Sequence, residues 1–217
     1  MAILEARAGA ICRRDPHVGG NGAYTVRSVY FDDYRNTCYR ENEDGTNPRE
    51  KYRIRIYNGD TGHIVLECKK KRDGKGCKDS CRLNSAQCRA MLDGTFSMSM
   101  LGGDGLREES RVLNRFFLQY TMRPLRAKTI VEYERKPYIY PAGNVRITFD
   151  RNISGSGRVR EFLGGGLRMR PVMPPGQHIM EVKFDELIPD ALHDALQLEG
   201  LRRTAYSKYF ICRKFCG

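Results

Sequence analysis

The sequence lacks both an apolar run long enough to span a membrane and a secretory signal. No stretch approaches the roughly 18 apolar residues that a membrane span requires. The opening residues, Met1 to Glu5, contain neither the basic segment nor the apolar segment of a signal peptide. We therefore expect a cytoplasmic protein with no membrane span in this chain, and a membrane-protein partner stays an open question.

The cysteines and histidines lack the spacing of a metal site. The chain has eight cysteines and four histidines, but no two cysteines form a C-x-x-C pair and no histidine stands at a ligand-like offset from them. A disulfide framework would require export, which nothing in the sequence indicates. We expect reduced thiols, most of them packed in the interior.

Acidic residues are scarce relative to basic ones. Lys and Arg number 38 against 26 Asp and Glu, which gives a net charge of +12. Such a surplus indicates an anionic partner, namely nucleic acid, membrane headgroups or a phosphorylated small molecule. The 217 residues, of which 40% are hydrophobic, fit one folded domain with a sizeable core or at most two small ones.

The predicted elements mix β-hairpins with inserted helices. Residues 41–48 are expected to form a loop, and the glycine-rich residues 155–166 a mobile one. This order indicates an α+β fold with a mostly antiparallel sheet. Strands are predicted over 24–32, 51–57, 63–71, 129–140, 145–153 and 179–184, and helices over 3–12, 85–92, 106–120, 189–198 and 204–215.

Five of these strands alternate charged and apolar side chains. Because successive side chains point to opposite faces of a strand, Lys51, Arg53 and Arg55 share one face. A set of such strands fits either a sheet with one open charged face or a barrel with a charged, hydrated lumen. The other charged faces carry Glu67 and Lys69; Tyr133 and Arg135; Arg146, Thr148 and Asp150; and Glu181 and Lys183.

The cations on such a face repel one another. Neighbours in the Lys51, Arg53 and Arg55 series lie about 7 Å apart, and each neighbouring pair repels by roughly 2 kcal/mol at an effective dielectric constant of about 20. Glu67, Asp150 and Glu181 would offset part of this repulsion. A polyanion would neutralise the rest, and phosphate suits the role because arginine binds its oxygens in a bidentate manner.

Seven short motifs occur in an order that resembles the VTC domain. This is the catalytic domain of the vacuolar transporter chaperone polyphosphate polymerases, in the triphosphate tunnel metalloenzyme (CYTH-like) superfamily. Each motif alone is weak, but the ordered set spans most of the chain. The motifs are Ser28-x-Tyr30-Phe31-Asp32, Lys51-x-Arg53-x-Arg55, Glu67-x-Lys69, Tyr133-x-Arg135, Arg146-x-Thr148-x-Asp150, Glu181-x-Lys183 and Ser207-Lys208-Tyr209.

The resemblance implies an antiparallel β-tunnel (barrel) with a basic hydrated lumen and helices packed outside. It implies a polymerase that transfers the γ-phosphate of ATP to a growing polyphosphate chain and releases ADP. Glu181 would bind the metal cofactor, Mn²⁺ or Mg²⁺. The implied phosphate-binding residues are Lys51, Arg53, Arg55, Lys69, Arg135, Arg146, Lys183 and Lys208, of which all except Lys51 and Lys208 would also serve catalysis.

The chain also departs from the family pattern. Family members usually open with a strand that carries a Glu-x-Lys-Tyr-like element, whereas this chain begins inside the helix that follows. We therefore expect a single domain over residues 1–217 that lacks the first strand, which would impair the tunnel and its activity. The Glu-x-Glu-x-Lys signature of the wider superfamily is absent, which disfavours a CYTH-type triphosphatase or adenylate cyclase.

Other functions stay open beside the polymerase. The domain could be a non-catalytic sensor that binds polyphosphate or nucleotide, or an inorganic triphosphatase in which water attacks the phosphate. Nucleic-acid binding is disfavoured, because the aromatic residues do not interleave with the basic ones as stacking platforms would. ATP and polyphosphate or triphosphate are therefore the expected partners.

Overall fold

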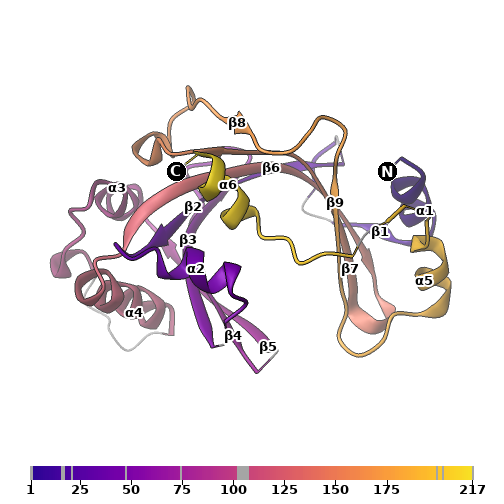
Figure 1. Ribbon diagram of the computed structural model, residues 1–217, viewed down its shortest axis with the longest axis horizontal. Coiled ribbons are helices and arrows are strands. Elements are labelled where there is room, and N and C mark those ends of the chain that lie inside the picture. Colours follow the sequence, from indigo (N-terminus) through magenta and orange to yellow (C-terminus); the bar gives the residue numbers. More distant parts are fainter. Residues whose placement is uncertain are drawn as a thin grey trace. The chain divides into compact units, whose positions relative to one another are not determined.

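The structure is a computed structural model that describes residues 2–15, 18–20, 22–46, 48–73, 75–101, 108–198, 200–201 and 203–216. Six α-helices and nine β-strands lie in these ranges (Figure 1). The helices are α1 (Ala2–Ile11), α2 (Thr37–Glu43), α3 (Ser85–Asp93), α4 (Glu108–Met122), α5 (Asp190–Leu196) and α6 (Lys208–Cys216). The strands are β1 (Arg13–Arg14), β2 (Tyr24–Asp32), β3 (Arg49–Tyr57), β4 (Ile64–Arg72), β5 (Lys75–Leu83), β6 (Arg126–Tyr140), β7 (Val145–Ser156), β8 (Arg170–Pro171) and β9 (Ile179–Lys183).

The strands form one sheet with the order β5-β4-β3-β2-β6-β7-β8, while β1 pairs with β6 and β9 with β7. The hairpins β3–β4 and β4–β5 are antiparallel, as are the pairings β2–β3, β7–β8 and β7–β9. The predicted α+β fold with an antiparallel sheet is therefore confirmed. Among the described residues this strand order does not return to its first strand, so closure into a tunnel stays a prediction.

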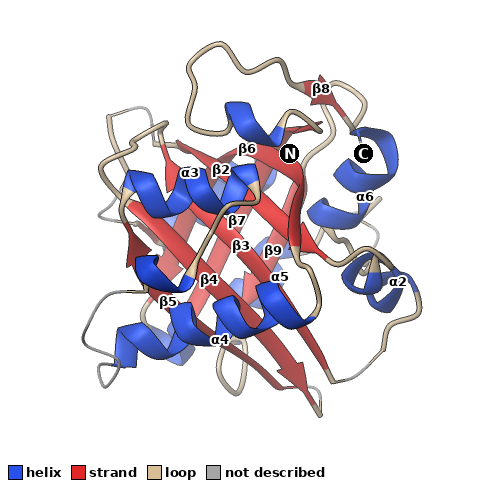
Figure 2. Ribbon diagram, turned by 90° about the vertical axis from the view of Figure 1, so that its left-hand side faces the viewer, coloured by secondary structure: helices blue, strands red, loops and turns tan. Residues whose placement is uncertain are grey.

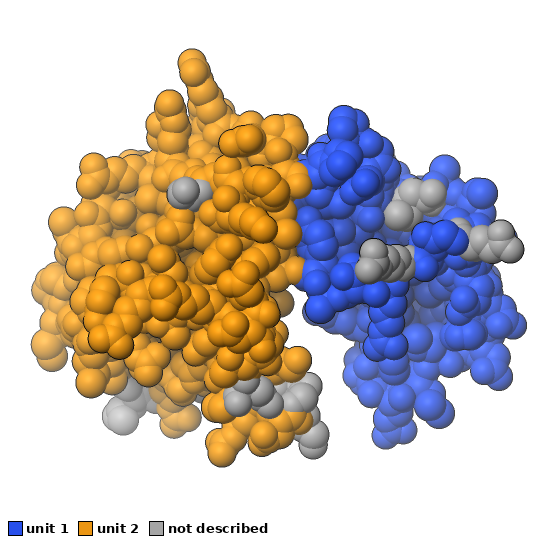
Figure 3. Space-filling view, in the orientation of Figure 1, with its two compact units in different colours: residues 1–25, 133–153, 173–206 blue, residues 26–132, 154–172, 207–217 orange. Residues whose placement is uncertain are grey.

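The chain divides into two compact units (Figure 3). Unit 1 consists of Met1–Thr25, Tyr133–Ile153 and Met173–Tyr206. Unit 2 consists of Val26–Glu132, Ser154–Val172 and Ser207–Gly217. Each unit has a hydrophobic cluster of its own. The expectation of a single domain over residues 1–217 stays a prediction.

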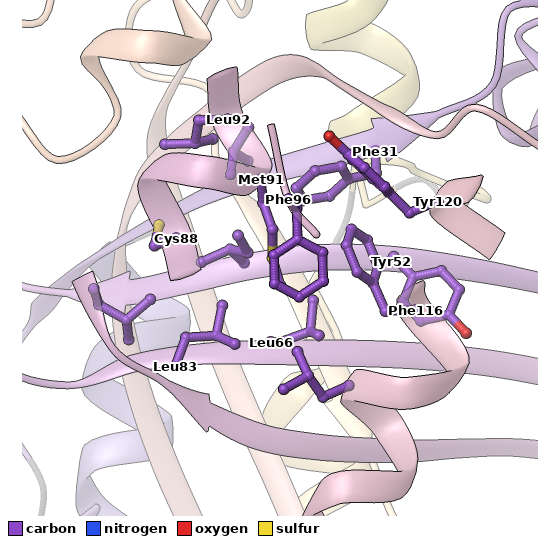
Figure 4. Packing of buried hydrophobic residues seen from close by; sticks show 14 of the residues in the cluster. Phe31, Tyr52, Leu66, Leu83, Cys88, Met91, Leu92, Phe96, Phe116 and Tyr120 are labelled. Carbon is purple, nitrogen blue, oxygen red and sulfur yellow. The ribbon is translucent and has the colours of Figure 1, made fainter. Parts of the chain in front are cut away.

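In unit 2, helices cover the apolar face of the central strands (Figure 2). Phe116 of α4 lies at the centre of this cluster, with its ring 5.0 Å from that of Phe31 and 5.3 Å from that of Tyr52 (Figure 4). Helix α3 is well delimited by its sequence, because Asn84 and Gln87 form a reciprocal capping box and Gly94 ends the helix in the left-handed conformation. The apolar residues of the alternating strands thus form the core that the pattern predicts.

In unit 1, α1 and α5 pack together with β7. Leu4 and Ala8 lie one helical turn apart in α1 and are both fully buried. Leu192 and Leu196 repeat this spacing in α5. The short helix predicted from apolar spacing at the start of the chain is therefore confirmed.

Two elements differ from the sequence prediction for tertiary reasons. A loop is predicted over 41–48, but α2 occupies Thr37–Glu43, because the buried Asp32 accepts the backbone N–H groups of Cys38 and Tyr39 at 2.9 and 3.0 Å. Strand β5 was not predicted, because its sequence is mostly polar, although Cys81 and Leu83, two residues apart, are buried. It pairs with β4 from Ile64 opposite Leu83 to Arg72 opposite Lys75.

Other predicted boundaries shift. The helix predicted over 204–215 begins at Lys208, because Ser207 caps it by accepting the N–H of Phe210 at 3.3 Å. The glycine-rich segment 155–166 begins inside β7, and its Phe162 is fully buried. Its mobility stays a prediction. The first two residues of the helix predicted over 106–120 lie outside the described residues.

The cysteines are packed thiols, as expected. All eight are free, and only Cys77 among them is exposed. Burial raises the pKa of Cys88 and of Cys212 to about 12, so these thiols are unreactive at neutral pH. None of the described helices is long and apolar enough to cross a membrane, and the cytoplasmic location stays a prediction.

Helix α6 approaches β7 at a glycine in unit 2. A Cβ atom at Gly155 would lie 2.9 Å from Cys212 Cβ and 3.0 Å from Cys216 Sγ, closer than such atoms can pack. The Tyr209 hydroxyl donates to Asp32 Oδ2 at 2.7 Å, and the Tyr39 and Phe210 rings stack at 4.7 Å. These contacts hold α6 against the rest of unit 2.

We predict that Gly155→Ala lowers the free energy of unfolding by about 1 to 3 kcal/mol, because α6 has to move to relieve the overlap. Urea denaturation followed by circular dichroism measures the change. Gly165→Ala is the control, since a Cβ atom there meets nothing within 4 Å. Equal midpoints for the two variants would contradict the close approach of α6.

Candidate functional site

The charged face of unit 2 lies on the other side of the strands from the hydrophobic cluster. Strand register brings its residues together: Arg53 lies opposite Tyr30 of β2 and Glu67 of β4, while Lys51 lies opposite Lys69. Lys69 in turn lies opposite Lys78 of β5. We call this set the cationic face; it consists of Ser28, Tyr30, Lys51, Arg53, Arg55, Glu67, Lys69 and Lys78.

Glu67 is the carboxylate at the centre of the cationic face. It is only 3% exposed, and its Oε2 lies 2.6 Å from Arg53 Nε and 3.9 Å from Arg55 Nη1. Lys78 Nζ lies 3.2 Å from the other oxygen. Burial acts to raise the pKa of Glu67, but the charges of Arg53 and Arg55 and the hydrogen bond from Arg53 outweigh it and lower the pKa to about 2. Glu67 is therefore ionised at every physiological pH.

The two arginines are buried and held by neutral partners as well. Each is 6% exposed. Arg53 Nη1 donates to the Tyr30 hydroxyl at 3.1 Å, and Arg55 Nε donates to Ser28 Oγ at 3.0 Å. Both guanidinium groups also lie near tyrosine rings, at 5.9 Å from Tyr30 and 5.8 Å from Tyr57. Guanidinium groups fixed in this way keep a defined orientation for the planar recognition of an anion.

The cationic face carries far more positive than negative charge. It carries five cations, Lys51, Arg53, Arg55, Lys69 and Lys78, of which Arg53, Arg55 and Lys78 pair with the carboxylate of Glu67. Burial lowers the pKa of Lys51, whose Nζ donates to Asn42 Oδ1 at 3.2 Å. Asp32, on the same face of β2, already accepts two backbone N–H groups of α2 and the Tyr209 hydroxyl. The surplus favours an anionic ligand.

Helix α6 begins beside this face. The Tyr209 ring lies 5.0 Å from that of Tyr30 and 4.9 Å from Lys51 Nζ. Lys208, the preceding residue, is half-buried. The structure therefore groups Lys208 with the predicted residues Lys51, Arg53, Arg55 and Lys69 in unit 2.

The other predicted site residues, Arg135, Arg146, Glu181 and Lys183, lie in unit 1. Arg135 donates two hydrogen bonds of 2.7 Å to the carboxylate of the fully buried Asp150. Burial acts to lower the pKa of Arg135, but the hydrogen bonds with Asp150 outweigh it and raise the pKa. Arg135 Nη2 also lies 3.8 Å from a Glu181 oxygen.

The other two predicted cations of unit 1, Lys183 and Arg146, are also paired with carboxylates. Lys183 Nζ lies 3.4 Å from Glu181 Oε1, and Arg146 Nη2 lies 3.0 Å from Asp15 Oδ2. Three cations thus meet three carboxylates in this cluster, Asp15, Asp150 and Glu181. This set therefore carries no surplus of positive charge, unlike the cationic face of unit 2.

The surroundings of Glu181 decide whether it can bind a metal ion. Within the part of the chain that the structure describes, no group of three or more His, Cys, Asp and Glu side chains is placed to hold a metal ion. Thr148 lies directly opposite Glu181 on β7, and its Oγ1 is buried without a hydrogen-bond partner among the described residues. Mg²⁺ commonly takes one or two carboxylates together with phosphate oxygens. Glu181 and Thr148 therefore fit a metal ion that arrives with phosphate.

Some residues of the site escaped the sequence analysis. Lys78 lies on the unpredicted strand β5, and Asp15 lies far from Arg146 in the sequence. Ser28 and Tyr30 belong to a motif of the sequence, but only the register of β2 with β3 shows that they contact the two arginines. Alternation within one strand reveals a shared face; it does not reveal partners across strands.

A family model described as the VTC domain matches residues 3–216. No curated protein matches the sequence. A crystal structure of a candidate adenylate cyclase from Bacillus halodurans is 12% identical, with a TM-score of 0.43, and the match covers 69% of this chain and 67% of that one. A TM-score this low supports no inference about this protein.

We predict that Glu67→Gln destabilises the protein by about 3 to 5 kcal/mol, because it leaves two buried guanidinium groups without their carboxylate. The lowered pKa of Glu67 also determines how the stability of the protein depends on pH. The stabilisation by Glu67 is fully present above pH 4.5, the ordinary pKa of a glutamate, and is lost as the pH falls towards about 2. Urea denaturation at neutral and acidic pH measures both effects.

Glu161→Gln serves as the control, since Glu161 forms an exposed pair with Arg158 three residues away. Such a pair contributes at most about 1 kcal/mol. If Glu67→Gln were no more destabilising than Glu161→Gln, Glu67 would not hold the buried arginines.

Proposed function

This chain belongs to the VTC domain family, and we propose that it binds phosphate chains on the cationic face of unit 2 and extends them with phosphate from ATP. The observation that supports the proposal most directly is the charge of that face. The face carries five cations, three of which pair with Glu67, and two of the five are guanidinium groups only 6% exposed. A ligand with oxygens along its length would neutralise the surplus.

The geometry suits a chain rather than a single anion. Lys51, Lys69 and Lys78 form a row across three neighbouring strands, with steps of about 5 Å between strands. Arg53 and Arg55 extend the positive charge along β3 in the perpendicular direction. Arginine would bind two phosphate oxygens at once, whereas the lysines would act as more adaptable point charges.

In the proposed reaction the phosphate chain is itself the nucleophile. A terminal oxygen of the growing chain forms a bond with the γ-phosphorus of ATP, the bond from that phosphorus to the β–γ bridging oxygen breaks, and the electron pair leaves with ADP. No side chain forms a covalent intermediate. The protein positions the phosphates and neutralises their charge, which is most of what phosphoryl transfer requires.

Unit 1 would supply the metal-binding residues. Glu181 and Thr148 would hold Mn²⁺ or Mg²⁺ together with phosphate oxygens, and the ion when bound would neutralise charge on those oxygens. Arg135, Arg146 and Lys183 stay predicted phosphate contacts, and they would have to exchange part of their bonding with Asp150, Asp15 and Glu181 for bonds with phosphate.

A sensor that binds phosphate chains without turnover is the second candidate. The cationic face is built wholly from residues of unit 2, whereas the proposed metal ligand Glu181 belongs to unit 1. Binding would therefore require nothing from Glu181. A triphosphatase, in which water takes the place of the chain oxygen, is distinguished from both by its product.

We predict that Lys69→Ala weakens the binding of tripolyphosphate about tenfold, because it removes one charged contact from the cationic face. Isothermal titration calorimetry measures the affinity, and the rise in melting temperature on adding the ligand checks it independently. The wild-type protein should be stabilised strongly by tripolyphosphate and weakly by sulfate, which cannot span several cations.

Lys70→Ala is the matched control on the same strand. It removes the same charge one residue away, from a side chain on the opposite face that pairs with Asp79. Its affinity for tripolyphosphate should equal that of the wild type. Equal weakening by both variants would show that binding follows net charge and not this face.

We further predict that the protein makes polyphosphate from ATP with Mn²⁺ or Mg²⁺, and that Glu181→Ala loses at least about a hundredfold in rate while still binding tripolyphosphate. Product length on gels, ADP release and phosphate release are measured together. Glu186→Ala, an exposed carboxylate of the same unit, is the control and should retain activity.

The products separate the candidate functions. Polymer with ADP supports the polymerase, and phosphate without polymer identifies a triphosphatase. Binding without any turnover identifies a sensor. A protein that binds neither ATP nor tripolyphosphate would overturn the whole proposal.

A further inference from the structure

The phenol of Tyr30 lies inside the cationic face. Tyr30 stands directly opposite Arg53 in the register of β2 with β3, and its hydroxyl accepts a hydrogen bond from Arg53 Nη1 at 3.1 Å. The ring packs against that of Tyr209 at 5.0 Å, and the residue is 7% exposed. A hydroxyl so placed is positioned to contact any anion that Arg53 binds.

The charged groups that surround Tyr30 come from β3 and β4. Strand β6 pairs with β2, but its Glu132 forms an ion pair with Arg27 on the opposite face of β2. Helix α6 contributes the neutral Tyr209. The groups that face Tyr30 are Lys51, Arg53 and Arg55 from β3, and Glu67 and Lys69 from β4.

These neighbours favour the ionised form of the phenol. Burial acts to raise the pKa of Tyr30, but the charges of Arg53 and Arg55, the hydrogen bond from Arg53 and the charge of Lys69 lower it to about 8. Glu67, with a pKa of about 2, does not change its charge in this range. Tyr30 is therefore a group of the face that can gain or lose a charge near neutral pH.

We propose that the Tyr30 phenol is a contact for the bound phosphate chain and that, as phenolate, it competes with that chain for Arg53 and Arg55. The proposal rests on the proposed function, because it assumes that this face binds phosphate. In the complex the neutral phenol donates its O–H to a phosphate oxygen. When the phenolate is present first, binding takes up one proton from solvent, which forms the phenol O–H bond.

The pH dependence follows from this competition. A nearby polyanion disfavours the phenolate, so the pKa of Tyr30 rises on binding. Affinity must therefore fall as the pH rises through about 8. One unit above that value, the competition lowers the affinity of the wild type about tenfold.

The first measurement is the ionisation of Tyr30 in the ligand-free protein. The chain has 12 tyrosines and no tryptophan, so tyrosinate absorbance can be followed without an indole background. The difference between the wild type and Tyr30→Phe should contain one tyrosine that titrates near pH 8. Tyr34→Phe, which removes the hydroxyl of a tyrosine that is 67% exposed, is the control and should leave this step in place.

The second measurement is the affinity for tripolyphosphate one unit below and one unit above pH 8. Below it, Tyr30→Phe should bind about fivefold more weakly than the wild type, since it lacks the phenol donor. Above pH 8, the wild type should bind no more tightly than Tyr30→Phe, or less tightly, since the variant also lacks the competing phenolate. Protons carried by the ligand itself cancel in the ratio of the two affinities, and a purely structural role for Tyr30 would leave the ratio constant.

The outcomes distinguish this inference from the proposed function. Binding by the wild type with a constant ratio, or the absence of a tyrosine that titrates near pH 8, overturns only the role of Tyr30. Failure of the wild type to bind at either pH overturns both. If Tyr30→Phe does not fold, the number of protons taken up on binding can be measured for the wild type by calorimetry in two buffers of different ionisation enthalpy. Proton uptake no greater than that of the ligand itself would contradict the proposal.

Discussion

The ion pairs between Glu67 and two buried arginines are the constraint on which the cationic face depends. A buried guanidinium group without a partner would cost several kcal/mol, and here one carboxylate on β4 serves both Arg53 and Arg55 of the neighbouring strand β3. The arrangement keeps the arginines oriented while leaving the face positive. A further carboxylate paired with these cations would make the face more stable by itself and less attractive to phosphate.

A second buried carboxylate organises the surroundings of that face. Asp32 ends β2, caps α2 through Cys38 and Tyr39, and accepts the Tyr209 hydroxyl of α6. One side chain thereby connects β2 and the adjacent α2 with α6, whose Tyr209 is 177 residues away in the sequence. The start of α6, with Lys208, is placed beside Tyr30 as a consequence.

The two units use similar charged strands with different electrostatic results. In unit 1 the cations Arg135, Arg146 and Lys183 each have a carboxylate close by, within 4 Å. Such a cluster is stable without a ligand and can bind phosphate only by exchanging partners. In unit 2 the surplus of cations makes the binding of an anion favourable from the outset.

The sequence by itself determined the alternation of charged and apolar side chains, and hence the strands, the shared faces of Lys51, Arg53 and Arg55, and the family. Alternation is a local property with a period of two residues, so a single strand suffices to reveal it. Strand β5 and helix α2 were not predictable, since β5 depends on pairing with β4 and α2 on a cap from Asp32.

Only the tertiary structure decided which charges meet. The partners Glu67 and Arg53 are 14 residues apart in the sequence, and Arg146 and Asp15 are 131 apart. Pairs of this kind are set by strand register and by burial, which act between segments and not within them. The difference between a balanced cluster in unit 1 and a cationic face in unit 2 therefore became visible only when the strands were paired.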